Sequence, residues 1–245
     1  MRRRTCIAAL AASGLLLVAA PTAAEADRRR EREQMVSNIA QLVAAGAAGG
    51  VRRLDPEVLA VMRRTPRHLF VPPDQQRLAY GDSALAIGHE ATISQPFIVA
   101  LMTDLLQVEP DEVALEVGTG SGYQAAVLSP LARHVYSIEI VPELARRAAA
   151  QLSAMGHRNV TVRAGDGYAG WPEHAPFDAI IVTAGATRVP PPLIAQLRPG
   201  GRLVIPVGPS GGAQQLTLVT KDARGRVRTQ RLLEVSFIPL TEPGA

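Results

Sequence analysis

The middle of the chain alternates between short apolar runs and segments in which apolar residues recur at three- and four-residue intervals. An apolar run bounded by turn residues predicts a buried strand, and the wider spacing predicts a helix that packs on a core. Strands and helices in regular alternation predict an α/β domain with a parallel sheet. The predicted strands are 113–117, 135–139, 160–163, 177–183 and the one that ends at 207, and the predicted helices are 123–131, 142–155 and 190–197.

The pattern changes near the end of the chain. Residues 214–220 and 227–235 read as strands, and Asp222-Ala-Arg-Gly225 between them has the composition of a turn, which predicts an antiparallel hairpin. Together with the parallel strands, this hairpin gives a doubly wound, mainly parallel seven-stranded sheet of the Rossmann-like kind with one antiparallel strand. Ligands of such sheets bind at the carboxyl ends of the strands.

Before residue 111 the pattern is helical, with one long interruption. Residues 27–50 have amphipathic spacing, and their charge run at 28–33 is predicted to be a solvated helix face. Asp55-Pro56 predicts the start of a second helix, which stops before the next proline. Prolines and glycines interrupt residues 66–96 too often for regular structure, so we predict a long functional loop there, followed by a helix packed on the sheet.

The first 26 residues have the pattern of a secretory signal. The positive residues Arg2–Arg4 precede an apolar stretch from Ile7 to Ala20, and Ala24-Glu25-Ala26 fits a cleavage site. This stretch is short and alanine-rich for a transmembrane helix, although an uncleaved anchor stays an alternative. We therefore expect export, with the periplasm as first choice and the cytoplasm as second, and a mature domain of residues 27–245 without stable membrane association.

The composition of the chain indicates which kinds of binding partner are expected. Apolar residues make up 47% of the chain and charged residues 20%, as in a soluble globular domain. Without residues 1–26 the chain keeps 23 basic and 21 acidic residues, because that segment holds three arginines and one glutamate. This balance and the absence of a basic stripe argue against nucleic acid. Cys6 is the only cysteine, so disulfides are not expected, and the five scattered histidines lack metal-ligand spacing.

The strongest motif is a glycine loop between the first predicted sheet strand and its helix. Gly118, Gly120 and Gly122 alternate with polar residues, and Glu116 lies two residues before the first of them. A phosphate loop needs Gly-Lys-Ser/Thr, and a dinucleotide fingerprint spaces its glycines differently. A carboxylate beside the loop would repel phosphates and suits a cation, such as the sulfonium of S-adenosylmethionine. The alternative is a glycine-rich turn in an ordinary α/β domain.

A second acid supports a nucleoside ligand. Glu139 ends the second predicted strand, roughly 20 residues after the glycines. An acid in this position of a nucleotide-binding sheet accepts hydrogen bonds from ribose hydroxyls. The alternative is a solvated residue at the end of a strand.

Several segments together resemble one family. They are Arg67-His-Leu-Phe-Val-Pro72, Tyr80-Gly-Asp82, Ile87-Gly88, Ala91-Thr-Ile-Ser-Gln-Pro96, Met102-Thr-Asp-Leu-Leu106 and Phe237-Ile-Pro-Leu-Thr241. The chain resembles the protein-L-isoaspartate O-methyltransferases from about residue 34 to residue 241. The Thr-Ile-Ser-Gln-Pro element is distinctive for that family, whereas many S-adenosylmethionine enzymes share the glycine loop. Glu90 departs from the family pattern, and a carboxylate there could repel a carboxylate substrate.

The resemblance implies a Rossmann-like methyltransferase that moves a methyl group from S-adenosyl-L-methionine to the free carboxylate of L-isoaspartyl residues in damaged proteins and peptides. Residues 27–110 would then hold the N-terminal helices and the substrate loop, and 111–245 the cofactor-binding sheet. We expect a monomer. Asp166-Gly167 follows the third strand, where such enzymes contact adenine, although an Asp-Gly pair also suits a simple turn. The implied cofactor residues are Ala91, Thr92, Ile93, Glu116, Gly118, Thr119, Gly120, Ser121, Gly122, Glu139, Asp166, Gly167 and Thr241.

The implied reaction needs no strong base. The acceptor carboxylate is already an anion and the sulfonium is already an activated donor, so catalysis reduces to in-line positioning and exclusion of water. The resemblance assigns Ser94 the role of orienting the carboxylate through its hydroxyl. Ser94 could also cap the helix that starts at Pro96. No metal is expected.

Two other functions stay open at this point. One is a small-molecule O- or N-methyltransferase on the same fold, which a substrate screen would detect. The other is an exported module that binds without catalysis, because S-adenosylmethionine is a cytosolic metabolite. Calorimetry with S-adenosylmethionine would separate that module from an enzyme.

Overall fold

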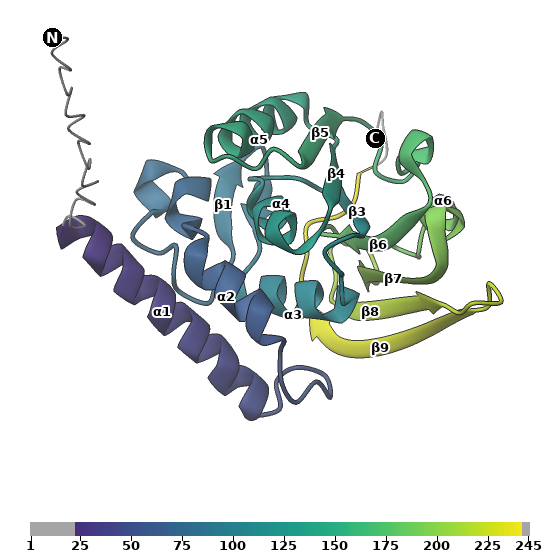
Figure 1. Cartoon of the computed structure of the whole chain (residues 1–245), viewed down its shortest axis with the longest axis horizontal. Helices are drawn as coiled ribbons and strands as arrows, with labels where there is room; N and C mark the ends of the chain where they lie inside the picture. The colour runs from purple at the N-terminus through teal and green to yellow at the C-terminus, as the bar shows by residue number, and fades with distance from the viewer. Residues whose placement is uncertain (1–22, 242–245) are drawn as a thin grey trace, which may run out of the picture.

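The computed structural model describes residues 23–241 of the chain, and Figure 1 shows their arrangement. Most of the predicted signal segment, residues 1–22, lies outside the described residues, so the structure does not test that prediction. The described part begins directly with a helix, α1 (Ala23–Ala44), which runs through the predicted cleavage site after Ala26. Among the described residues, no helix has the length and apolar character needed to cross a membrane.

A seven-stranded sheet forms the centre of the molecule, with strand order β5-β4-β3-β6-β7-β8-β9. The first five strands in this order are parallel, and β8 runs antiparallel to both of its neighbours. The predicted sheet, its single antiparallel strand and its terminal hairpin are therefore confirmed. The strands are β3 (Val113–Val117), β4 (His134–Glu139), β5 (Val160–Ala164), β6 (Phe177–Val182), β7 (Leu197–Val207), β8 (Gln214–Lys221) and β9 (Val227–Val235).

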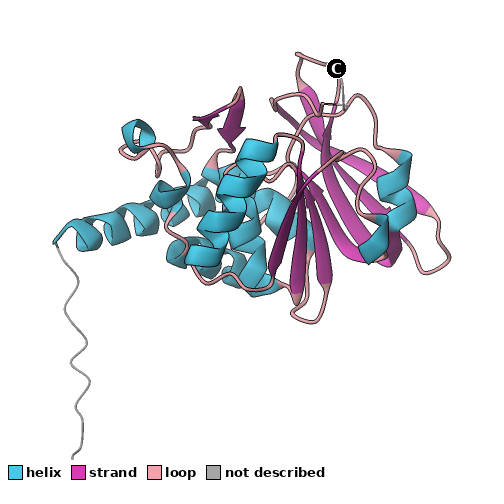
Figure 2. Ribbon diagram, turned by 90° about the horizontal axis from the view of Figure 1, so that it is seen from above, coloured by secondary structure: helices cyan, strands magenta, loops and turns pink. Residues whose placement is uncertain are grey.

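Helices cover both faces of the sheet (Figure 2). On one face, α3 (Pro96–Leu106), α4 (Tyr123–Leu128) and α5 (Pro142–Ala154) share a buried apolar cluster with side chains of β3, β6 and β7. On the other face, α6 (Pro191–Gln196) contributes Leu193 to a second cluster. Since alternate residues of a strand point to opposite faces, a parallel strand covered on both sides must be apolar nearly throughout, as the sequence pattern predicted.

The N-terminal helices pack against α3. α2 (Pro56–Arg64) begins where predicted, because the side chain of Asp55 accepts a hydrogen bond from the backbone N–H of Glu57, and it ends before Pro66. The prediction that the charge run of α1 is wholly solvated is wrong for one residue. Arg32 has only 8% of its surface exposed, because its guanidinium lies against α2 and the loop that follows it.

The loop after α2 contains more regular structure than predicted. Two short 3₁₀ turns, 67–70 and 73–75, precede a small antiparallel hairpin of β1 (Leu85–Gly88) and β2 (Ala91–Ile93). The hairpin was missed because its turn uses backbone that residue preferences do not predict. His89 and Glu90 both have positive φ angles, 54° and 57°, which side chains with a Cβ rarely adopt.

Candidate functional site

The carboxyl ends of the central strands face the β1–β2 hairpin across a cavity of about 710 Å³. The glycine loop after β3, the end of β4 and the segment after β6 form one side, which we call the donor side. The hairpin and the start of α3, residues 89–99, form the other, which we call the acceptor side. The tail after β9, up to Thr241, completes the wall. Most of the residues predicted from separate motifs therefore lie around one space.

Backbone contacts hold the glycine loop against β4. The N–H groups of Gly118 and Thr119 both donate to the carbonyl of Ile138, at 2.8 and 3.2 Å. Gly118 has a φ of +96°, and a Cβ there would lie 2.5 Å from the Thr183 hydroxyl oxygen. Only glycine therefore fits at this position without movement of its neighbours. The third glycine, Gly122, provides the left-handed residue from which α4 begins.

Glu139 lies at the end of β4, as predicted, and is fixed by two backbone groups. One carboxylate oxygen accepts from the N–H of Gly120 at 2.7 Å, and the other accepts from the N–H of Val141 at 3.0 Å. The side chain lines the cavity although only 6% of the residue is exposed. Since a carboxylate has about four acceptor positions, capacity remains for the two hydroxyls of a ribose.

Glu116 does not occupy the place that the sequence suggested. It is fully buried, it does not line the cavity, and the hydroxyl of Ser137 donates to its carboxylate. Burial raises the pKa of Glu116 to about 8, so the neutral form is favoured near neutral pH. The idea that its charge attracts a cationic ligand by contact is therefore wrong in this structure. The physical reason is that β3 is covered on both faces along most of its length, and only its last residue, Val117, lines the cavity.

Other acids give the cavity its charge. Glu90, Glu139 and Glu234 line it, and among residues 23–241 no lysine or arginine does so. A cationic sulfonium therefore suits this cavity, as predicted, but through carboxylates other than Glu116. Glu234 was missed because the sequence offers no signal that this residue of an exposed hairpin strand lies at a site.

Asp166 and Gly167, which were predicted either to contact adenine or to form a simple turn, have different roles in the structure. Gly167 lines the cavity, and a Cβ there would lie 2.4 Å from a methyl carbon of Val117. Asp166 does not line the cavity, and its carboxylate accepts from the N–H of Tyr168 at 2.8 Å. The structure thus brings the predicted glycine to the site and uses the aspartate as a turn residue.

Ser94 lies on the acceptor side, between β2 and α3, and lines the cavity. It does not cap α3. The capping position is Gln95, and the free N–H of Phe97 donates instead to the carboxylate of Asp82 at 2.8 Å. Within residues 23–241, no group forms a hydrogen bond with the Ser94 hydroxyl. Its polar group is therefore available to a ligand.

The hairpin brings the acceptor side close to the donor side. A Cβ placed on Gly120 would lie 3.4 Å from the Ile87 side chain and 4.0 Å from the carbonyl of Thr92. Arg147 on α5 donates to the carbonyl of Ile87 at 2.8 Å and holds the hairpin there. Of the remaining predicted residues, Gly122 does not line the cavity. The others do, namely Ala91, Thr92, Ile93, Gly118, Thr119, Gly120, Ser121 and Thr241.

Thr241 reaches the site because the tail is tied to the segment after β6. The N–H of Leu240 donates to the carbonyl of Gly185 at 2.7 Å, and the N–H of Gly185 donates to that of Ile238 at 2.8 Å. Thr183 in the same segment was missed, although its hydroxyl donates to the carbonyl of Gly118 at 2.6 Å. In the described part of the chain, no three His, Cys, Asp or Glu side chains are grouped as metal ligands would be.

Comparison with known proteins gives a consistent result. The model of the protein-L-isoaspartate(D-aspartate) O-methyltransferase (PCMT) family matches residues 38–244. Protein-L-isoaspartate O-methyltransferase 1 of Cupriavidus necator is 54% identical over 232 residues, which cover 94% of this chain and 90% of that protein. The protein-L-isoaspartate O-methyltransferase of Opitutus terrae is 52% identical over 242 residues, 98% of each chain. A solved protein-L-isoaspartate O-methyltransferase is similar at a TM-score of 0.71 and 27% identity, covering 83% of this chain and 65% of its own.

Proposed function

The chain belongs to the protein-L-isoaspartate(D-aspartate) O-methyltransferase family, and from this premise we propose how its residues perform the reaction of that family. It is a repair enzyme that moves a methyl group from S-adenosyl-L-methionine to the free carboxylate of L-isoaspartyl residues. The match covers nearly the whole predicted mature chain, so neither a small-molecule methyltransferase nor a non-catalytic module keeps its support.

The donor side has the features that S-adenosylmethionine requires. Gly118 and Gly120 allow the backbone to approach a ligand closely, and Glu139 has acceptor positions left for ribose hydroxyls. Gly167 leaves room where a larger residue would collide with Val117. When bound, this cofactor supplies a methyl group on a positively charged sulfur, which the acidic lining stabilises.

The acceptor side needs to hold and orient an anion. We assign this role to Ser94, whose hydroxyl can donate a hydrogen bond to the isoaspartyl carboxylate. The observation that carries the assignment is that Asp82 caps α3, which leaves Ser94 without a structural task in the cavity wall. No proton has to be removed from the acceptor, so a hydroxyl that aims one carboxylate oxygen at the methyl group is sufficient.

Replacement of Ser94 by alanine tests this assignment. For Ser94→Ala we expect kcat with an isoaspartyl peptide to fall about 100-fold, because a misaligned acceptor loses much of the benefit of positioning. The Kd of S-adenosylmethionine, measured by calorimetry, should not change. Ser83→Ala is the matched control, since Ser83 is exposed in the same loop and does not line the cavity. A Ser94→Ala enzyme with wild-type turnover would show that another group orients the acceptor.

We also propose that the enzyme is exported to the periplasm as a monomer, through the segment 1–26. Its positive start, apolar stretch and Ala24-Glu25-Ala26 support export. The relative from Opitutus terrae aligns with 98% of this chain, so the alignment extends into the same segment. The protein recovered from a periplasmic fraction should begin at Asp27 and have the mass of one chain by light scattering. Recovery from the cytosol with Met1 in place would contradict export.

A further inference from the structure

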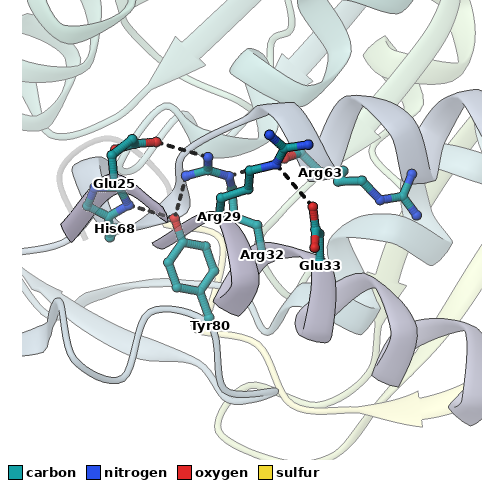
Figure 3. A network of polar contacts seen from close by, with 7 residues as sticks. All are labelled: Glu25, Arg29, Arg32, Glu33, Arg63, His68 and Tyr80. Atoms are coloured by element: carbon teal, nitrogen blue, oxygen red, sulfur yellow. Dashed lines mark hydrogen bonds and ion pairs between the residues drawn. The ribbon is translucent and has the colours of Figure 1, made fainter. Parts of the chain in front are cut away.

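The first half of α1 is bound to the substrate loop through two arginines. Arg28 donates to the carbonyl of Gln76 at 3.1 Å from a partly exposed position, and the buried Arg32 contacts Tyr80. We call residues 25–36 of α1 the brace. All of it precedes the segment that matches the family model, residues 38–244. Arg32 is the buried cation of the brace, with 8% of its surface exposed. Figure 3 shows its guanidinium pointing toward Tyr80 and Glu25, whereas Arg29 on the same helix pairs with Glu33. A buried guanidinium is costly unless its donors are paired, so the contacts of Arg32 reveal what holds it there.

Each nitrogen of the Arg32 guanidinium has an acceptor. The Nε donates to the carbonyl of Arg63 at 3.2 Å, at the end of α2. One terminal nitrogen lies 3.5 Å from the Tyr80 hydroxyl, and the other pairs with Glu25 at 3.1 Å. The first two contacts reach elements far along the chain, so Arg32 fixes the brace to α2 and to the substrate loop at once.

Tyr80 is the buried point of contact between the brace and the substrate loop. It is 8% exposed, and its hydroxyl lies 2.6 Å from the Nδ1 of His68. Arg32 and His68 therefore hold one hydroxyl from two sides, as Figure 3 shows. Just before Tyr80, the carbonyl of Ala79 accepts from the Nε of Arg67 at 2.8 Å, and Arg67 is fully buried. The loop is thus fixed at this point by side chains rather than by a ladder of backbone bonds.

The contacts continue from Tyr80 to the acceptor. Two residues after Tyr80, Asp82 accepts from the backbone N–H of Phe97 at 2.8 Å and from the side-chain amide of Gln95 at 3.2 Å. Gln95 directly follows Ser94. The position of Asp82 therefore determines where the start of α3, and with it the Ser94 hydroxyl, lies in the cavity wall.

From this chain of contacts we propose that Arg32 is a positioning residue for methyl transfer, which acts through Tyr80 and Asp82 on Ser94. The inference rests on the proposed role of Ser94. The inference predicts different effects on the two sides of the cavity. Hydrogen bonds within the sheet and its loops hold the glycine loop and Glu139, so neither needs contact with the brace. Loss of Arg32 should consequently impair alignment of the acceptor and leave donor binding intact.

The test uses the full-length enzyme with Arg32→Gln, Tyr80→Phe and the double variant. For Arg32→Gln we expect kcat with an isoaspartyl peptide to fall about 10-fold, as a small misplacement of the acceptor produces, while the Kd of S-adenosylmethionine stays within about twofold. Tyr80→Phe should give a loss of similar size. The double variant should lose no more than the larger single change, because both substitutions break the same path.

Two matched controls accompany these variants. Arg29→Gln removes an exposed arginine of the same helix and should leave both quantities unchanged. Glu25→Gln should also stay near wild type, since the Glu25 side chain is 54% exposed and Arg32 keeps its bonds to Arg63 and Tyr80. Cleavage of the signal segment after Ala26, which removes Glu25, should therefore leave the rest of the brace attached to α2 and to the substrate loop.

A purely structural role for Arg32 predicts a different result. Thermal unfolding of each variant is measured alongside its kinetics, and a lower Tm with unchanged kcat below the unfolding temperature would overturn the inference. If Arg32→Gln does not fold, Tyr80→Phe decides alone, because it keeps the ring and removes only the hydroxyl. A wild-type enzyme that binds the donor but ignores isoaspartyl peptides, or a Ser94→Ala variant with full turnover, would instead refute the proposed function on which the inference depends.

Discussion

The two sides of the cavity are built by different means. On the donor side, backbone hydrogen bonds between adjacent parallel strands hold most of the ligand-facing segments in place. An example is the pair of bonds that Gly118 and Thr119 donate to Ile138. On the acceptor side, side chains connect segments that have little regular structure, as when Asp82 receives the N–H of Phe97. We conclude that the donor side is a property of the sheet, whereas the acceptor side depends on a small number of particular side chains. Substitutions should therefore affect donor binding and acceptor alignment separately.

The largest effect that sharpens this comparison is expected for Glu139→Gln. The amide cannot accept from both Gly120 and Val141 as the carboxylate does, and it loses the charge-assisted hydrogen bond to a ribose hydroxyl. Such bonds contribute about 1.5–3 kcal/mol, so we expect the Kd of S-adenosylmethionine to rise roughly 10- to 100-fold. The KM of the peptide at saturating donor should stay near wild type. Glu143→Gln, an exposed change on α5, is the control, and an equal rise in peptide KM would mean that the two sides are coupled.

A smaller effect, on stability rather than binding, is expected for Glu116→Gln. The pKa of Glu116 rises from 4.5 to about 8 on folding because of burial, so the folded chain holds a proton that the unfolded chain releases. Burial of this group therefore lowers the free energy of unfolding most above pH 8 and does not lower it below about pH 4.5. Between these values the free energy of unfolding falls as the pH rises. A neutral glutamine removes that dependence.

The measurement is thermal unfolding of both proteins between pH 5 and pH 8.5. The Tm of Glu116→Gln should match that of the wild type near pH 5 and exceed it by roughly 5 °C or more at pH 8.5. The Kd of the donor should be unchanged at pH 7, in contrast with Glu139→Gln. A Kd raised as much as by Glu139→Gln would mean that Glu116 reaches the ligand after all.

The smallest effect concerns the acceptor side and Glu90→Gln. Glu90 is exposed at the tip of the β1–β2 hairpin and lines the cavity, where its charge opposes an anionic acceptor. We expect the KM of an isoaspartyl peptide to fall about twofold at low salt and to approach the wild-type value at high salt, since exposed charges are screened. Glu109→Gln, at an exposed residue away from the cavity, is the control. If the KM of the peptide does not change at low salt, Glu90 does not determine peptide affinity.

The same contrast explains what the sequence could predict. The five parallel strands and Glu139 follow from apolar runs and from the rule that ligands meet strand ends, because these features are local and periodic. The burial of Glu116 does not, since the apolar pattern predicts a covered strand but does not show whether a single acid within it points into the interior or toward a ligand. Residue preferences also do not predict the left-handed turn at His89 and Glu90.

Contacts between distant residues account for the rest. Asp82 caps a helix that begins 14 residues later, at Pro96, and Arg32 reaches Tyr80 across 48 positions of the chain. No periodicity links such residues. The Thr-Ile-Ser-Gln-Pro segment pointed to Ser94 only through its resemblance to a family, and the geometry then supplied the physical reason why this hydroxyl is free.

The most direct test of the account is methyl transfer from labelled S-adenosylmethionine to two peptides that differ only in having an isoaspartyl or an aspartyl residue. The purified enzyme should methylate the isoaspartyl peptide and leave the aspartyl peptide essentially unlabelled, because Ser94 orients one carboxylate against the donor side. Equal labelling of both peptides, or labelling of neither by an enzyme that binds the donor in calorimetry, would contradict the account.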